Sequence, residues 1–230
     1  MGKGRVEAFS DGVLAVAITL LVLDLKVERE GPDGRSLAFQ LAHNWPSYVA
    51  YATSFVVIGV IWVNHHALFT LIERVDRIFL FQNLILLMFV TTMPFTTSTL
   101  AKFLSAGGAD ARWAVALYGI SNIGMSWAYF SMLHRMIHHG LLRYPVEAAA
   151  GRSALIRFGI GNVAYPISTG CGLLWPPAML ILTGALAIYY MFEQTQLLPD
   201  GEADPGSADP GSADQGGADQ GGADQVRARA

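Results

Sequence analysis

The residues of this chain that could do chemistry stand at the start of its first apolar segment. Arg5, Phe9, Ser10 and Asp11 place a cation, an aromatic ring, a hydroxyl and a carboxylate directly before residues 12–23, which are apolar enough to lie in lipid. A charge near or inside a bilayer is costly unless it is paired or hydrated. A helix that served only as an anchor would not need these groups, so we expect them to have partners elsewhere in the protein.

The partners that we expect lie on the second apolar segment. Arg5 and Asp11 are six residues apart and therefore do not face each other within one helix. We hypothesise a polar network that sets the first helix in place, with Phe9 beside it. Its members are Arg5, Ser10, Asp11, Trp62 and either His65 or His66. The alternative is that the two histidines are ordinary interfacial residues. Because histidine titrates near neutrality, the network interpretation allows an effect of pH.

The same helix carries a stripe of small and medium-sized residues. Gly12, Val16, Thr19 and Leu23 are spaced i, i+4, i+7 and i+11, which places them on one helical face. Small residues commonly mark contacts between membrane helices, and the residues alone favour that interpretation. The other interpretation is a pore on a symmetry axis between subunits, where a narrow apolar ring sheds its water and acts as a gate.

The elements that must position these groups are long apolar segments. Of the 230 residues, 53% are hydrophobic and only 14% are charged, which is too apolar for a soluble domain of this size. A membrane helix needs about 20 apolar residues. The sequence therefore predicts an all-α, polytopic membrane protein with six transmembrane helices, at residues 6–26, 46–71, 78–101, 112–135, 154–174 and 176–193.

The distribution of basic residues predicts the orientation of these segments. With six spans, both termini share one side with the second and fourth loops, and that side holds ten Lys and Arg residues against five on the other. The positive-inside rule then places both termini in the cytoplasm. We expect the protein to lie in the plasma membrane. We expect a membrane domain at residues 1–195. Residues 201–225 repeat in units of five without large apolar side chains, so we predict a disordered cytoplasmic tail at 196–230.

Other classes of protein are weighed against the remaining motifs. The histidine run at 134–139, together with His65 and His66, has the spacing of a membrane di-iron enzyme, but the chain has only six histidines, fewer than such a site uses. Pro94 and Pro166 could break two helices, as in a secondary transporter, although no similarity links the two halves. A scaffold or assembly protein is a further alternative. The sequence contains no basic stripe, so nucleic-acid binding is not expected. The single cysteine excludes an intrachain disulfide.

One local pattern resembles a known family. Arg5-x-x-x-Phe9-Ser10-Asp11, followed by Gly12 and an apolar stretch with Thr19-Leu20-Leu21, is similar to the first-helix signature of the transmembrane protein 175 family. Members of that family are potassium channels of endolysosomes and prokaryotes, and the six-segment layout resembles its one-repeat prokaryotic members. The resemblance implies a passive, potassium-selective homotetramer whose first helices surround a central pore.

The resemblance also implies roles for particular residues. It assigns the apolar constriction and a nearby threonine to Val16, Thr19 and Leu23, with Gly12 on the same stripe. Val16 is smaller than the leucine or isoleucine often found at the constriction, which leaves the pore width open. No Thr-Val-Gly-Tyr-Gly filter is present, so any potassium preference must arise from dehydration at the constriction, helped by the Thr19 hydroxyl. The partners implied are further copies of the chain, the lipid bilayer and potassium ions, with no catalytic residue, cofactor or resident metal ion.

Overall fold

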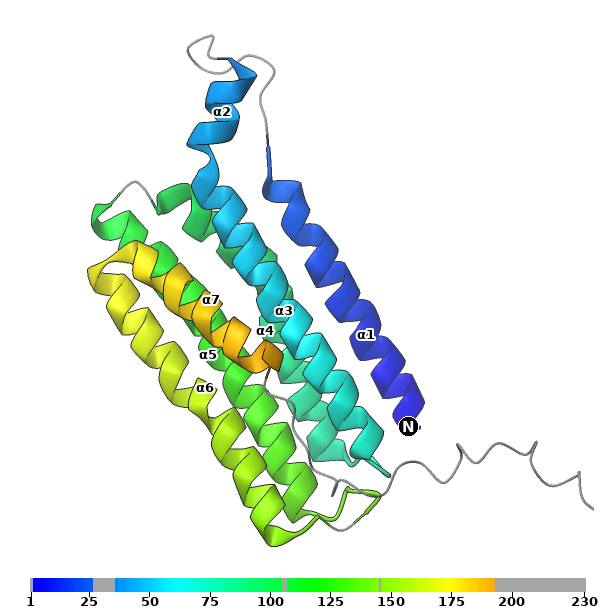
Figure 1. Ribbon diagram of the computed structural model, residues 1–230. Helices are drawn as coiled ribbons and strands as arrows, with labels where there is room; N and C mark the ends of the chain where they lie inside the picture. Colours follow the sequence, from blue (N-terminus) through cyan, green and yellow to red (C-terminus); the bar gives the residue numbers. More distant parts are fainter. Residues whose placement is uncertain (1, 27–35, 105–106, 145, 193–230) are drawn as a thin grey trace, which may run out of the picture. The chain divides into compact units, whose positions relative to one another are not determined.

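The computed structural model describes residues 2–26, 36–104, 107–144 and 146–192. All named secondary-structure elements in these ranges are helices (Figure 1). This confirms the all-α fold class, and the predicted tail at 196–230 lies outside the described residues. Two described helices are short: η1 (Leu21–Asp24), a 3₁₀ turn that continues α1, and α2 (Leu37–His43). The six long helices correspond to the six predicted segments: α1 (Lys3–Leu20), α3 (Trp45–Leu71), α4 (Arg77–Phe103), α5 (Gly108–His138), α6 (Ala148–Leu174) and α7 (Pro176–Phe192).

Hydropathy separates the long helices into two groups. Among the described helices, Lys3–Asp24, Trp45–Leu71 and Arg77–Phe103 are long and apolar enough to cross a membrane. Helices α5 and α6 have the length, with 31 and 27 residues, and α7 is apolar but has 17 residues. The inward faces of α5 and α6 bury polar side chains such as Ser121 and Ser168.

The predicted segments differ from the helices mainly at their ends. Helix α5 begins at residue 108 rather than 112, and α6 begins at 148 rather than 154. The seven-residue helix α2 was not predicted at all. A hydropathy pattern marks the part of a helix that suits lipid, whereas the backbone continues helically through polar turns beyond it.

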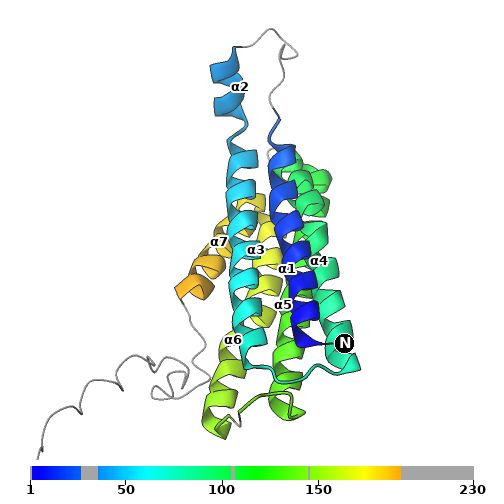
Figure 2. The same cartoon turned by 90° about the vertical axis from the view of Figure 1, so that its right-hand side faces the viewer.

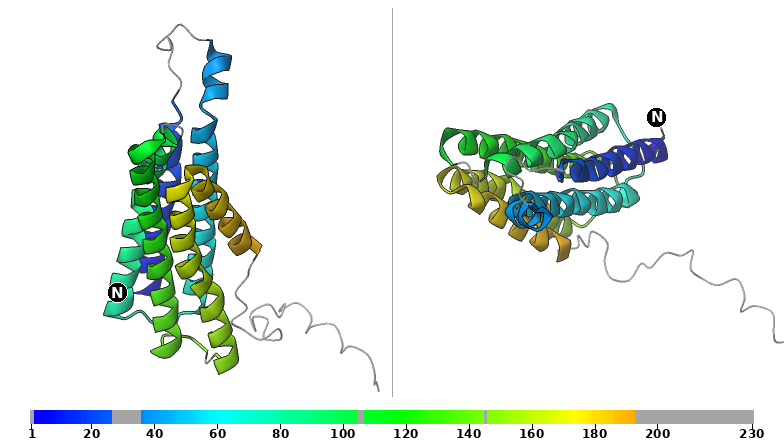
Figure 3. Two further views of the ribbon diagram at one scale, coloured as in Figure 1. Left: turned by 90° about the vertical axis from the view of Figure 1, so that its left-hand side faces the viewer. Right: turned by 90° about the horizontal axis from the view of Figure 1, so that it is seen from above.

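Helix α1 packs against only one side of the bundle. It contacts α3 and α4, which also contact each other, while α5 lies between α4 and α6 and α7 packs on α6 and α3. In Figure 2, α1 lies in the foreground with α3 and α4 on either side. The view from above in Figure 3 shows the outer side of α1 turned away from the other helices. The first helix is therefore held along one face only.

Both internal prolines lie within continuous helices. Helix α4 runs through Pro94 and α6 runs through Pro166, and neither helix is interrupted at the proline. Broken helices that meet at the midplane, as in many secondary transporters, are therefore not present at these two positions.

One end of the bundle is joined by contacts between loops. The Lys3 ammonium donates to the Ile72 carbonyl at 2.8 Å, and Ile72 pairs with Leu142 in an isolated β-bridge. Asp76 caps α4 by accepting from the Phe79 amide at 2.8 Å, and it also accepts from Arg135 Nε at 3.0 Å. The Arg135 guanidinium lowers the pKa of Asp76 from 3.8 to about 2. The start of α1, the α3–α4 loop and the α5–α6 loop thus share one end.

Candidate functional site

The inward face of α1 is a continuous buried stripe. Its members recur every three or four residues, which is the spacing of one helical face. They are Val6, Ser10, Leu14, Ala17 and Leu21. Apart from Ser10 they are apolar, so most of this face is held by hydrophobic contact with α3 and α4.

The predicted pore stripe lies on the other side of α1. Val16 is 56% exposed and Leu23 is 64% exposed, and Gly12 and Thr19 are exposed as well. A methyl group added at Gly12 would meet no atom within 4 Å. The Thr19 hydroxyl donates to the Val16 carbonyl of its own helix at 2.9 Å. Within one protomer this stripe therefore contributes little to folding.

A buried hydrogen-bonded chain crosses three helices behind that stripe. Asn83 of α4 donates from Nδ2 to Ser10 Oγ at 2.8 Å, and Ser10 in turn donates to the Val6 carbonyl at 2.9 Å. On its other side, Asn83 Oδ1 lies 2.9 Å from His65 Nε2 of α3. Ser10, Asn83 and His65 are all at most 1% exposed.

The hydrogen bonds of Asn83 indicate that His65 Nε2 carries a proton. Asn83 uses its amide to donate to Ser10, so its Oδ1 can only accept, and His65 Nε2 must carry the proton. His65 Nδ1 has no hydrogen-bond partner among the described residues. The ring stacks on Phe69, with 4.5 Å between the ring centroids. His65 therefore links α3 to α4 through Asn83.

A second set of polar contacts joins α1 to α3 nearer the surface. Trp62 donates from Nε1 to Asp11 Oδ1 at 3.1 Å. One helical turn away, His66 Nδ1 lies 3.1 Å from Glu7 Oε1. Two i, i+4 pairs thus face each other across antiparallel helices, which fixes the rotation of α1 about its axis.

The structure distributes the hypothesised network over two separate groups. It brings Asp11 to Trp62, and it joins Ser10 to His65 only through Asn83. Arg5 is exposed and its side chain makes no hydrogen bond or ion pair with the described residues, and Phe9 is also exposed.

Two residues of these groups were missed by reasoning from the sequence. Asn83 is the asparagine of the third apolar segment, and its cost in lipid was a signal that it needed a partner. Glu7 stands one turn before Asp11 and could have been included with it on the same helical face.

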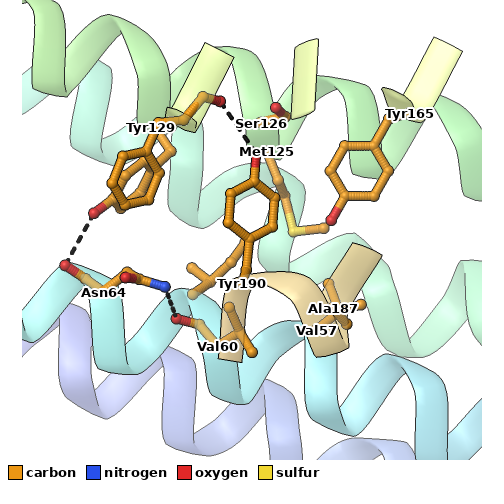
Figure 4. Close-up of a pocket in the computed structure, with 11 residues that line it drawn as sticks. Val57, Val60, Asn64, Met125, Ser126, Tyr129, Tyr165, Ala187 and Tyr190 are labelled. Carbon is orange, nitrogen blue, oxygen red and sulfur yellow. Dashed lines mark hydrogen bonds between the residues drawn. The ribbon is translucent and has the colours of Figure 1, made fainter. Parts of the chain in front are cut away.

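A small cavity lies away from α1, between α3, α5, α6 and α7 (Figure 4). Its volume is about 50 Å³, and its polar groups are largely paired: Tyr129 donates to the Asn64 carbonyl at 3.0 Å, and the Tyr190 hydroxyl accepts from the Gly161 amide at 2.8 Å. The residues that line it include no charged side chain. This space suits a few water molecules rather than the charged substrate pocket of a transporter.

Comparisons with known proteins agree with this architecture. The family model for the endosomal/lysosomal potassium channel TMEM175 matches residues 5–94. A potassium channel of Streptomyces collinus is 44% identical over 203 residues, which are 87% of this chain and 97% of that protein. The human endosomal/lysosomal proton channel TMEM175 is 36% identical over 192 residues, which are 70% of this chain and 38% of that protein.

A solved structure shows the same fold. The crystal structure of a lysosomal potassium-selective channel TMEM175 homologue from Chamaesiphon minutus superposes with a TM-score of 0.73 and 33% identity. The match covers 82% of this chain and 96% of that one.

Fold and site together define a polytopic helical membrane protein. Its first helix packs on α3 and α4 with one face and is exposed on the other. The chain belongs to the TMEM175 family. Because this is a family of ion channels, the di-iron enzyme suggested by the histidine spacing is rejected. His134 and His138 lie one turn apart on α5, with 4.4 Å between their ring centroids.

Proposed function

We propose that this chain is a passive, potassium-selective cation channel that assembles as a homotetramer, with four α1 helices around a central pore. The observation that carries the proposal is the exposed stripe of Gly12, Val16, Thr19 and Leu23, opposite the face by which α1 is held. The relative from Streptomyces collinus is a potassium channel, and the Chamaesiphon minutus homologue is potassium-selective, which supports the choice of ion.

Selectivity in this proposal arises from dehydration. Val16 and Leu23 would form apolar rings on the axis, and a cation that passes a narrow apolar ring loses part of its water shell. A potassium ion loses water at a lower cost than the smaller sodium ion. The Thr19 hydroxyl donates its proton to the Val16 carbonyl, so its oxygen lone pairs remain free to face a cation. No catalytic residue and no cofactor is needed for this mechanism.

The proposed orientation has both termini in the cytoplasm and the helices in the plasma membrane. The bond from Lys3 to the Ile72 carbonyl supports a shared side for the N-terminus and the α3–α4 loop. That end also carries Arg74, Arg77 and Arg135, as the positive-inside rule expects for the cytoplasmic side. We assign residues 1–195 to the channel domain and 196–230 to a cytoplasmic tail.

The test is ion flux in liposomes that contain the purified full chain, under potassium and sodium gradients. We expect potassium flux in the wild type and a several-fold lower potassium-to-sodium ratio in Thr19→Ala. Thr91→Ala is the matched control, because Thr91 is also exposed and also donates to a carbonyl three residues earlier, on α4. Absence of potassium flux from a correctly assembled wild type would contradict the channel. An equal ratio change in both variants would contradict the role of Thr19.

A second candidate ion is the proton, because the human relative is a proton channel. The same liposomes, loaded with a pH-sensitive dye, measure it directly. Acidification of the lumen that exceeds the rate in protein-free vesicles would add protons to the permeant ions. A rate equal to that of protein-free vesicles would restrict the pathway to metal cations.

A further inference from the structure

The second polar group between α1 and α3 has the composition of a metal site. One ligand atom from each of Glu7, Asp11 and His66 lies within 4.8 Å of the other two. Glu7 and Asp11 stand one turn apart on α1, and His66 faces them from α3. The group is separate from the buried Ser10–Asn83–His65 chain and from the exposed pore stripe.

We propose that Glu7, Asp11 and His66 bind one divalent metal ion such as zinc, cobalt or nickel. This ion would bridge α1 and α3. His66 would supply Nδ1, and Glu7 and Asp11 would each supply one carboxylate oxygen. Water would complete a tetrahedral set, since zinc accepts nitrogen and oxygen ligands in fours. This proposal differs from the sequence-based expectation that the chain holds no resident metal ion.

The distances require only small side-chain shifts. Zinc lies about 2.0–2.2 Å from nitrogen and oxygen ligands, so tetrahedral ligand atoms stand roughly 3.3–3.6 Å apart. His66 Nδ1 and Glu7 Oε1 are already 3.1 Å apart, and the whole set falls within 4.8 Å. A closing movement of about 1 Å is within reach of a glutamate side chain that is only partly packed.

The surroundings suit a dication with an imidazole ligand. Two carboxylates supply two negative charges, which balance the charge of the ion. The imidazole favours zinc, cobalt or nickel over magnesium and calcium, which prefer sets made only of oxygen. Trp62 donates to Asp11 Oδ1 and so orients that carboxylate while leaving its second oxygen for the ion. The His66 side chain is 57% exposed, so the protomer itself does not enclose the site.

The test measures metal binding and uses no ion flux, so its outcome is distinguishable from failure of the proposed channel. The purified full chain in detergent is titrated with zinc by calorimetry and with cobalt by visible absorption. We expect one ion per chain, with affinity at least about tenfold weaker in His66→Asn, Glu7→Gln and Asp11→Asn. Asp11→Asn keeps an acceptor for Trp62, so it separates metal ligation from packing. His138→Asn is the matched control, because His138 stands one turn from His134 and that pair could also hold a metal ion.

A second readout keeps the proposal falsifiable if one variant folds poorly. Zinc should raise the midpoint of thermal unfolding of the wild type and of His138→Asn, because an ion bound only by the folded chain stabilises it. It should raise the midpoint of Glu7→Gln by less than that of the wild type. The proposal is overturned if His66→Asn and Glu7→Gln bind as the wild type does, or if only His138→Asn loses the ion.

Discussion

The two faces of α1 differ in what covers them. On the inward face, Ser10 is fully buried and its hydroxyl belongs to a chain that reaches α3 and α4. On the outward face, Val16 and Leu23 are more than half exposed, and among the described residues the Thr19 hydroxyl bonds only its own helix. A face that contributes little to the fold of one protomer is available for contacts outside that protomer. The inward residues hold α1 within the protomer, whereas the outward residues are the ones proposed to line the pore.

The largest expected effect is on the inward face. Asn83→Ala should destabilise the protomer by roughly 2–5 kcal/mol, because it leaves both Ser10 and His65 without their buried partner. The measurement is unfolding in mixed micelles titrated with a denaturing detergent. Thr91→Ala, on the exposed side of the same helix, should stay within about 0.5 kcal/mol of the wild type. Equal stability of Asn83→Ala and Thr91→Ala would remove the distinction between the faces.

A smaller effect is expected where the two faces meet. Asp11→Ala removes the acceptor of Trp62 and should cost about 0.5–1.5 kcal/mol, since this bond is partly exposed. We expect less assembled protein in size-exclusion chromatography and an unchanged potassium-to-sodium ratio in liposomes. Trp62→Phe should have a similar effect, and the double variant should be no worse than either one. A stable Asp11→Ala assembly with altered ion preference would place Asp11 in the ion path instead.

The smallest effect concerns the loops at the end of the bundle, which belong to neither face. The lowered pKa of Asp76, about 2 against an ordinary 3.8, means that its ion pair with Arg135 is fully stabilising above about pH 4 and is lost as the pH falls through 2. The difference in thermal midpoint between wild type and Asp76→Asn should therefore stay constant from pH 5 to 8 and shrink below pH 4. A difference that changes across pH 5–8 would mean that another group carries the pH dependence.

The sequence predicted the elements better than the contacts between them. Long apolar runs located the six long helices, because lipid-like composition and helical length go together. The short helix α2 has no such run, and the polar ends of α5 and α6 extend past theirs. Helical periodicity placed Gly12, Val16, Thr19 and Leu23 on one face, and the structure leaves that face exposed.

The partners of the polar residues were harder to predict, because pairing between helices depends on depth and rotation. Ser10 and His65 are joined through Asn83, from a helix that the network hypothesis did not include. Arg5 was expected to take part and instead lies exposed. A single sequence shows which polar side chains need a partner. Which partner each one finds depends on how the three helices pack together.

The most direct test of a pore along α1 is chemical block at Val16. Val16→Cys is placed in a Cys171→Ala background, because Cys171 is an exposed free thiol. Val163→Cys on α6 is the matched control, since Val163 is 62% exposed, close to the 56% of Val16. A charged thiol-directed methanethiosulfonate reagent should reduce potassium flux several-fold through Val16→Cys and leave Val163→Cys unchanged. Unchanged flux through Val16→Cys, with the modification confirmed by mass spectrometry, would contradict a pore lined by the first helix.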